Sequence, residues 1–190
     1  MNIRFVRPED VDALRAIYAQ YIPTNVTFEY ELPSREEFLR RITEFSACYP
    51  YIVLEHEGRI VGYSYAHRLW ERAAYQWDVE LTVYLSRECT GAGLGGKLCN
   101  IVLELLKLQG VHTVYSLLGG PNDPSEKMHQ SIGFRHIGTH EKSGYKNGVW
   151  ADVIWYEKNL LPFDPEPAPI RTIHQLPPEQ VQAVMDTFHA

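Results

Sequence analysis

The stretch GAGLGG at residues 91–96 leads into a segment with the periodicity of a helix, which begins within the stretch at Leu94. That segment carries apolar residues at helical spacing, namely Leu94, Leu98, Ile101, Leu105 and Leu108. Glycine adopts positive φ angles at little cost and lets another molecule approach the main chain closely. A helix start also has unpaired N–H groups and the positive end of the helix dipole, which together bind phosphate. The stretch therefore predicts a site for a phosphate-bearing ligand at a helix N-terminus.

Strands and helices are predicted on both sides of this stretch. Alternating and apolar runs predict strands at residues 3–6, 51–68 (a hairpin that turns at Glu57 and Gly58), 79–85, 112–118, 134–143 and 149–160. Helical spacing and capping residues predict helices at residues 8–21, from Ser34 through Phe45, at 94–108 and at 124–132. This order favours an α/β fold with a mixed sheet.

Two common nucleotide-binding loops do not fit the glycine stretch. A Walker loop needs Ser or Thr directly after its lysine, but Lys97 is followed by Leu98. A dinucleotide-binding loop belongs in the first strand–helix–strand unit, with an acidic residue ending the next strand. Here the glycines follow the fourth predicted strand, and the strand at 112–118 ends without an acid. Both loops are therefore excluded.

Composition and charge narrow the class of protein. A chain of 190 residues is long enough for one domain with a substantial core. The net charge of −6 argues against nucleic acid as a partner, because that partner needs a basic face. The three cysteines form no CxxC pair, so neither a disulfide framework nor a metal site is expected. The start MNIRFVRPEDVDAL lacks an apolar signal core and no stretch is long enough for a membrane span, which favours a cytoplasmic protein without a membrane partner.

The pattern divides the chain into a domain at residues 1–160 and a tail at residues 161–190. The tail begins proline-rich and ends in a short amphipathic helix with Val181, Val184, Met185 and Phe188 on one side. We expect this apolar side to dock either on its own domain or on a second subunit, and the sequence leaves both open.

The order of elements and several spaced motifs resemble the GNAT superfamily of acetyl-CoA-dependent N-acetyltransferases. TGAGLG at residues 90–95 matches the motif Q/R-x-x-G-x-G/A of that superfamily except at Thr90. GGPNDPSEKMHQSIGF at residues 119–134 looks like the segment N-D-P-S-x-x-M-H-x-x-x-G-F/Y of the phosphinothricin and methionine sulfoximine or sulfone acetyltransferases. FEYELPSREEF, YAHRLWERAAYQWDVELTVYLS and NGVWADVIWY resemble further segments of that family in the same order.

The resemblance implies the GNAT acetyltransferase fold, with a mixed, mostly antiparallel central sheet flanked by helices, and acetyl-CoA as co-substrate without a metal. Amides of the glycine stretch would hold the CoA pyrophosphate, and Thr90 would weaken that binding without abolishing it. The strand edge before the stretch would pair with the pantetheine arm like an added strand. Asn122 would bind the same arm, or cap the helix at Pro124. The expected cofactor-binding residues are Val83, Leu85, Thr90, Gly91, Ala92, Gly93, Leu94, Gly95, Gly96, Asn122 and Ser125.

The resemblance also implies three catalytic roles. Glu80 would be the general base for the acceptor amine, although a glutamate in an alternating strand commonly faces solvent. His129 would protonate the leaving CoA thiolate, or else only pack in its helix or hydrogen-bond the sulfur. A backbone N–H at Val83, Tyr84 or Leu85, here assigned to Tyr84, would stabilise the charge that develops on the thioester oxygen.

Acceptor binding is expected from residues that match or neighbour the family's pocket positions, namely Phe28, Glu31, Arg72 and Tyr75. Arg72 suits a substrate carboxylate through a bidentate contact, or it is a solvated loop charge. Glu31 would attract the ammonium group, or cap a turn. These roles come from the resemblance and not from periodicity.

The implied reaction is acetyl transfer to the α-amino group of a small amino-acid-like acceptor, with phosphinothricin, methionine sulfoximine and methionine sulfone as model acceptors. Transfer would be direct, because neither Cys89 nor Cys99 lies in a Cys/His nucleophile pattern. Two alternatives stay open: a peptide or protein N-terminal acetyltransferase, which needs an open groove, and a non-catalytic CoA-binding sensor, which the departure at Thr90 favours. The family also implies a homodimer.

Overall fold

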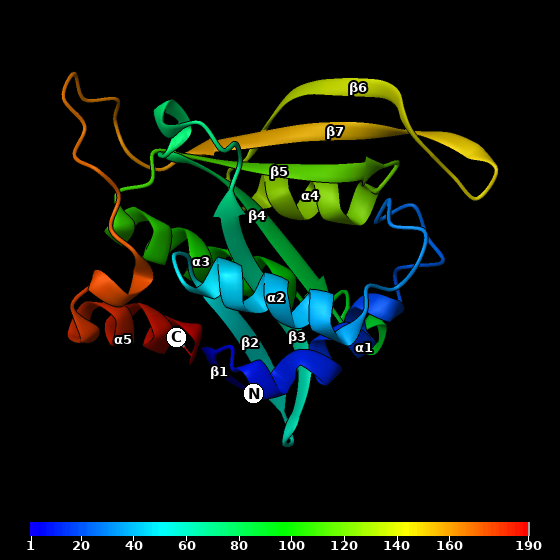
Figure 1. The fold of residues 1–190 in the computed structure, drawn as a ribbon, viewed down its shortest axis with the longest axis horizontal. Helices are drawn as coiled ribbons and strands as arrows, with labels where there is room; N and C mark the ends of the chain where they lie inside the picture. Colours follow the sequence, from blue (N-terminus) through cyan, green and yellow to red (C-terminus); the bar gives the residue numbers. More distant parts are fainter. Residues whose placement is uncertain (190) are drawn as a thin grey trace.

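The computed structural model describes residues 1–189, whose seven strands form one sheet in the order β1-β2-β3-β4-β5-β7-β6 (Figure 1). The strands are β1 (Asn2–Phe5), β2 (Tyr51–His56), β3 (Arg59–Arg68), β4 (Asp78–Leu85), β5 (Thr113–Gly120), β6 (Arg135–Lys146) and β7 (Val149–Asn159). The α-helices are α1 (Val11–Ala19), α2 (Arg35–Ser46), α3 (Leu94–Gln109), α4 (Asp123–Ser131) and α5 (Pro178–Asp186). In this sheet β4 and β5 are parallel, and the other neighbours are antiparallel. The predicted mixed, mostly antiparallel sheet is confirmed.

Local sequence signals explain where several elements begin and turn. The Ser34 side chain accepts a hydrogen bond from the backbone N–H of Glu37 at 3.1 Å, which caps α2. Glu57 and Gly58 both have positive φ, 50° and 75°, as the tight turn between β2 and β3 requires. Several boundaries differ from the prediction: the first helix starts as a 3₁₀ turn at Pro8–Asp10 and ends at Ala19, β5 runs to Gly120, and β6 extends to Lys146.

Helices cover both faces of the sheet because successive strand residues point to opposite sides. Ile52 and Leu54 of β2 belong to the larger core, which they form with α3. Tyr51 and Val53 of the same strand belong to a second core with α1 and α2. One face of β2, β3 and β4 is therefore turned towards α1 and α2, and a cavity lies on that side.

β4 and β5 separate after a short contact, and this separation positions the site. Their parallel pairing covers only residues 78–80 against residues 113–115. β5 then pairs with β7 along its whole length, whereas β4 stays paired with β3. The two strands diverge beyond Glu80, as Figure 1 shows, and within residues 1–189 no strand pairs with the β5 side of β4 at residues 81–85. Only side chains reach carbonyl oxygens there: the Ser116 hydroxyl donates to Leu81 at 3.4 Å and the Tyr21 hydroxyl donates to Leu85 at 2.6 Å.

The C-terminal tail docks on its own domain, which is one of the two places that the sequence left open. Its predicted apolar residues, Val181, Val184, Met185 and Phe188, all pack in the core with α3. Gln109, at the end of α3, anchors the chain before α5. Its Nε2 donates to the carbonyl oxygens of Cys48 at 2.7 Å and Arg171 at 2.6 Å, and the N–H of Arg171 donates back to the Gln109 carbonyl.

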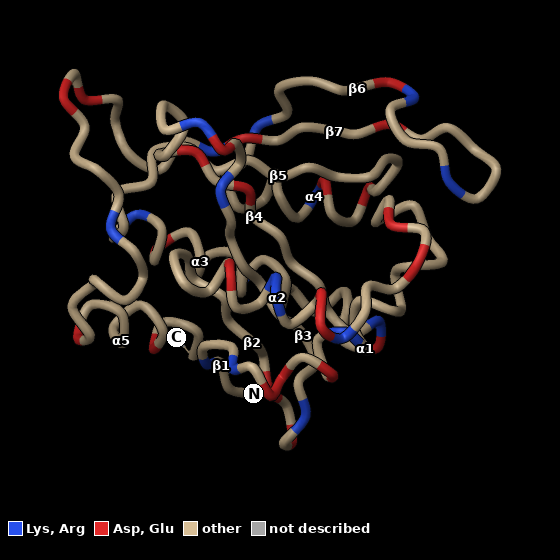
Figure 2. Tube along the Cα trace, viewed as in Figure 1, with Lys and Arg blue, Asp and Glu red and all other residues tan. Residues whose placement is uncertain are grey.

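Charges of both signs are spread along the chain. Figure 2 shows Lys and Arg residues interspersed with Asp and Glu residues, and α2 carries both. Among residues 1–189, no helix has the length and apolar character that a membrane crossing needs.

We expect Gln109→Met to lower the free energy of unfolding by about 1–3 kcal/mol, because two carbonyl oxygens lose the N–H donors of a side chain that is 1% exposed. Urea denaturation followed by circular dichroism measures the change. Gln180→Met, at an exposed position of α5, is the control and should change stability by less than about 0.5 kcal/mol. A Gln109→Met protein as stable as wild type would show that this side chain does not fix the tail.

Candidate active site

Two connected cavities occupy the space that opens between β4 and β5. A cavity of about 230 Å³ lies between the sheet and the helices α1 and α2. A groove of about 740 Å³ runs along the unpaired edge of β4 to the start of α3. The residues that line both are Val26, Val83, Tyr84, Asn122 and Ser125. A ligand in the groove can therefore meet a second ligand in the cavity.

The glycine stretch forms one end of the groove. Gly91 and Gly93 have φ angles of 83° and 75°, a conformation that glycine adopts without strain, and Gly93 is the N-cap of α3. No side chain among residues 1–189 caps this helix, so the N–H groups of its first turn stay available. Amides and the positive end of a helix dipole suit a diphosphate. The residues present thus fit the pyrophosphate of CoA.

Most of the predicted cofactor residues line the groove, namely Val83, Leu85, Thr90, Gly91, Gly93, Leu94, Gly95, Gly96, Asn122 and Ser125. Ala92 is exposed and does not line it. The Thr90 hydroxyl donates to the Arg87 carbonyl at 2.9 Å, so its hydrogen is already used in a bond within the loop. Sequence analysis missed two cations of the groove wall, Arg87 and Lys127, which add positive charge where a phosphate would lie.

Glu80 is the carboxylate at one end of the cavity. It is the last β4 residue paired with β5, and it lies opposite His67 of β3. Its Oε2 is 3.7 Å from Nε2 of His67, and 23% of its side chain is exposed. Burial raises the pKa of Glu80 above that of an ordinary glutamate, and the charge of His67 opposes this rise. A carboxylate of raised pKa accepts a proton more readily, which suits a general base.

His129, on α4, is 2% exposed and has hydrogen bonds at both ring nitrogens. Its Nδ1 lies 2.8 Å from the Ser125 carbonyl oxygen, which can only accept, so Nδ1 carries the proton. Nε2 then accepts the hydroxyl hydrogen of Ser116 at 2.8 Å. Burial lowers the pKa of His129, which favours this neutral form. Because Nε2 has no proton to give in this form, the predicted role as general acid stays a prediction that requires Ser116.

Tyrosines that sequence analysis did not single out form much of the cavity wall. Tyr51 of β2 stacks on Tyr65 of β3 with ring centroids 4.6 Å apart, and Tyr63 stacks beside them. The alternation of Tyr63, Tyr65 and His67 places these three side chains on one face of β3, a period-2 signal that was readable in the sequence. The Tyr84 side chain lines both spaces, and the predicted role of its backbone N–H stays a prediction.

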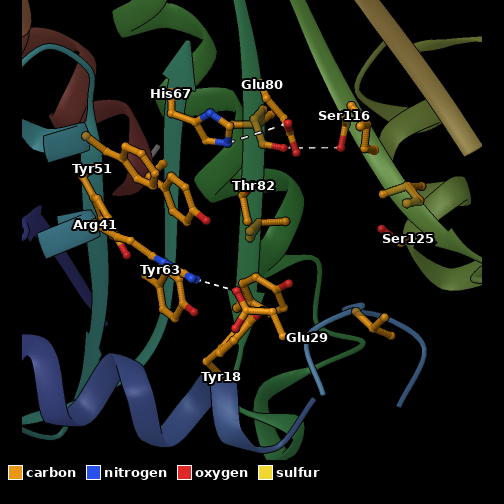
Figure 3. Close-up of a pocket in the computed structure, with 18 of the residues that line it drawn as sticks. Tyr18, Glu29, Arg41, Tyr51, Tyr63, His67, Glu80, Thr82, Ser116 and Ser125 are labelled. Atoms are coloured by element: carbon orange, nitrogen blue, oxygen red, sulfur yellow. Dashed lines mark hydrogen bonds and ion pairs between the residues drawn. The ribbon is translucent and has the colours of Figure 1, made fainter. Parts of the chain in front are cut away.

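A charged pair lies at the other end of the cavity, opposite Glu80 and His67 (Figure 3). Arg41 of α2 donates through Nη1 to Glu29 at 2.6 Å and through Nε to Glu37 at 2.8 Å. In the sequence, Glu37 and Arg41 have the spacing of an ordinary surface pair on a helix. Nothing local in the sequence brings Glu29, which lies in the preceding loop, to this helix.

The predicted acceptor-binding residues, Phe28, Glu31, Arg72 and Tyr75, do not line this cavity. Phe28 packs against Gly144 of β6, where a Cβ would come within 2.5 Å of its ring. Glu31 and Arg72 are exposed, and Tyr75 packs edge-on against Trp70. The structure does not bring these side chains together with Glu80, and their role in acceptor binding stays a prediction.

The comparisons with known proteins agree with this geometry. Residues 3–155 match the family model of the acetyltransferase (GNAT) domain. A phosphinothricin N-acetyltransferase of Streptomyces viridochromogenes is 35% identical over 178 residues, covering 93% of this chain and 96% of the relative. An L-methionine sulfoximine/L-methionine sulfone acetyltransferase of Pseudomonas paraeruginosa is 27% identical over 167 residues, covering 85% of this chain and 95% of the relative.

Among solved structures, a GNAT superfamily phosphinothricin acetyltransferase from Sinorhizobium meliloti in complex with acetyl-CoA is similar with a TM-score of 0.80. It is 28% identical and covers 83% of this chain and 87% of its own. The chain therefore belongs to the GNAT acetyltransferase family, as an N-acetyltransferase that uses acetyl-CoA.

Proposed function

We propose that the enzyme acetylates the α-amino group of a small amino-acid-like acceptor of the phosphinothricin, methionine sulfoximine or methionine sulfone type. One observation carries this proposal: a carboxylate of raised pKa lies in a small cavity that shares its wall with the cofactor groove. The names of the relatives support this class of acceptor.

Proton removal is the first task of the site. An α-amine has a pKa of about 8 and is largely protonated at neutral pH, so it cannot attack before it loses a proton. Glu80 takes this proton at its carboxylate and then releases it to solvent through its exposed part. Acetyl-CoA supplies an activated acetyl group, and a backbone N–H on the edge of β4 near Tyr84 stabilises the charge that its carbonyl oxygen gains.

A second proton leaves the amine nitrogen after the attack, and Ser116 with His129 provides its path. Neutral His129 accepts this proton at Nε2 through the Ser116 hydroxyl and returns it to the departing sulfur by the same path. The proton lost by nitrogen is the proton gained by sulfur, so the step balances. In this proposal His129 keeps its role as proton donor, and Ser116 is the group that faces the ligands.

Direct transfer is favoured over an acyl-enzyme intermediate on cysteine. Cys99 is fully buried in the core on α3, and burial raises the pKa of its thiol to about 12. Such a thiol is protonated and out of reach of the co-substrate. Cys89, in the turn Arg87–Cys89, lines neither the cavity nor the groove.

A small acceptor fits the cavity better than a peptide chain. The space of about 230 Å³ is bounded by residues of α1, α2 and the loop that carries Glu29. An extended peptide would need an open channel beyond these elements, whereas an amino acid needs only a compact pocket with a few polar groups.

The homodimer also stays a proposal. β6 is an edge strand of the sheet, and its hairpin with β7 exposes Tyr145, Val149 and Trp150. These apolar side chains support an interface there. The tail, by contrast, is already engaged by its own domain.

We expect Glu80→Gln to lower kcat by about 10²- to 10⁴-fold, because the amide cannot accept the amine proton. The KM for acetyl-CoA should hardly change, since Glu80 does not line the groove. Thiol release from acetyl-CoA, measured with phosphinothricin and methionine sulfone, tests this. Glu104→Gln, on the exposed side of α3, is the control. A Glu80→Gln enzyme with wild-type kcat would exclude Glu80 as the base.

We expect His67→Gln to move the acid limb of the pH profile of kcat to higher pH. The charge of His67 lowers the pKa of Glu80, so its removal lets that pKa rise further. Glu80 acts as a base only when ionised, and a higher pKa therefore requires a higher pH for the same activity. The profile is measured at saturating substrates, with His136→Gln on β6 as the exposed control. A limb that stays in place or moves to lower pH would contradict the coupling.

We expect Ser116→Ala and His129→Asn each to lower kcat on the order of 10²-fold, because each interrupts the same proton path. The double variant should be no slower than the slower single variant, since the two residues act as one unit. Ser143→Ala is the control, because this exposed serine of β6 lines neither the cavity nor the groove. Additive losses in the double variant would refute a shared path.

A further inference from the structure

The end of the cavity opposite Glu80 holds a cation that the proton chemistry does not use. Arg41 lines the cavity, and 32% of its side chain is exposed. Figure 3 shows it reaching from α2 to Glu29, beside Tyr18 and Tyr63. A guanidinium placed in an acceptor cavity is a donor-only group, so it distinguishes anionic from cationic ends of a ligand.

Arg41 has hydrogen-bond donors left for a ligand. A guanidinium has five N–H groups, and the bonds to Glu29 and Glu37 engage only Nη1 and Nε. Its Nη2 makes no hydrogen bond with any residue from 1 to 189. The charge of Arg41 also lies close enough to the hydroxyls of Tyr51 and Tyr65 to lower their pKa against the effect of burial. Arg41 and these hydroxyls therefore face a common space.

The two glutamates bound to Arg41 each face a second cation. The Nζ of Lys146 donates to the carbonyls of Thr24 and Thr27. Burial lowers the pKa of Lys146, and the nearby negative charge of Glu29 opposes this shift. Glu37 also accepts hydrogen bonds from Arg40. Arg40 also binds Glu44, so three cations (Arg40, Arg41 and Lys146) face three carboxylates (Glu29, Glu37 and Glu44). An anion at Nη2 still gains a charge-assisted hydrogen bond.

The shape of the cavity places this donor away from the reacting amine. Glu80, Thr82 and Tyr84 point from β4 to the same side. Glu80 and Tyr84 are four residue steps apart along the strand, which is about 13 Å. Glu80 lies at one end of this stretch and Tyr84 lies at the other, where burial raises the pKa of Tyr84 and the nearby charge of Glu29 adds to that rise. A group bound by Arg41 is therefore the far end of an acceptor side chain.

We propose that Arg41 selects acceptors whose side chain ends in a carboxylate or phosphinate, by donating from Nη2 to that group. The inference rests on the proposed function, because it places the α-amino group at Glu80. The Tyr51 hydroxyl, which has no hydrogen bond within residues 1–189, donates to the same group. A sulfone end is uncharged, so it accepts these hydrogen bonds but binds more weakly than an anion does. An alkyl end accepts no hydrogen bond.

The test compares Arg41→Met, Arg41→Lys and Arg40→Met. Arg40 is the matched control, because it shares Glu37 with Arg41 but does not line the cavity. Calorimetry measures the Kd of phosphinothricin, methionine sulfone and norleucine on the enzyme–CoA complex, which binds acceptor without turnover. We expect Arg41→Met to raise the Kd of phosphinothricin about 10- to 100-fold, that of methionine sulfone less and that of norleucine hardly at all. Arg41→Lys should restore part of the difference, and Arg40→Met should change none of the three.

Three results would overturn the inference. In the first, wild type does not bind phosphinothricin; in the second, Arg41→Met binds it as well as wild type does. In the third, Arg41→Met loses affinity equally for norleucine, together with a lower melting temperature, which would mean that Arg41 only ties the Glu29 loop to α2. Thiol release by the wild type is measured in parallel. No release with any acceptor would overturn the proposed function, whereas the binding data would still decide the role of Arg41.

Discussion

The separation of β4 from β5 is the constraint on which the rest of the site depends. A central strand whose edge is left unpaired exposes backbone N–H and C=O groups that need partners. Here β5 pairs with β7, while no strand among residues 1–189 pairs with the β5 side of β4 at residues 81–85, where the carbonyls of Leu81 and Leu85 accept only side-chain hydroxyls. An extended ligand with amide groups satisfies such an edge as a strand would. The break in the sheet therefore creates the groove and leaves along it the backbone groups that an amide-bearing ligand would pair with.

The same opening sets the proton chemistry through burial. Glu80 and His129 lie on opposite sides of the break, one on β4 and one on the helix after β5. Removal from water raises the pKa of the carboxylate and lowers the pKa of the imidazole, because it disfavours the charged form of each. Glu80 thus becomes a better proton acceptor and His129 is held neutral. One physical cause thus acts on both groups, whereas their surroundings differ: Glu80 lies 3.7 Å from His67, and His129 is hydrogen-bonded at both ring nitrogens.

Sequence reasoning succeeded where the signal is local. The glycines at 91–96, the cap at Ser34 and the turn at Glu57 each act within a few residues, so their structures follow from short segments. The cavity is not local: its wall combines loop residues with residues of three helices (α1, α2 and α4) and four strands (β2 to β5). Arg41 had the spacing of a surface ion pair, and the state of His129 depends on Ser116, which lies on another element. Such juxtapositions arise only when the chain is folded.

The two halves of the site also differ in how they tolerate change. The groove half, which we propose for the cofactor, presents much backbone: a strand edge, a helix start and glycines that permit positive φ. Most side-chain substitutions leave backbone groups in place, so a chain can diverge to 35% identity and keep this half. The acceptor half is made of side chains, and replacing one of them changes what the cavity can bind. Similarity to relatives thus identifies the co-substrate with more force than the acceptor, and the acceptor has to be inferred from the residues that wall this cavity.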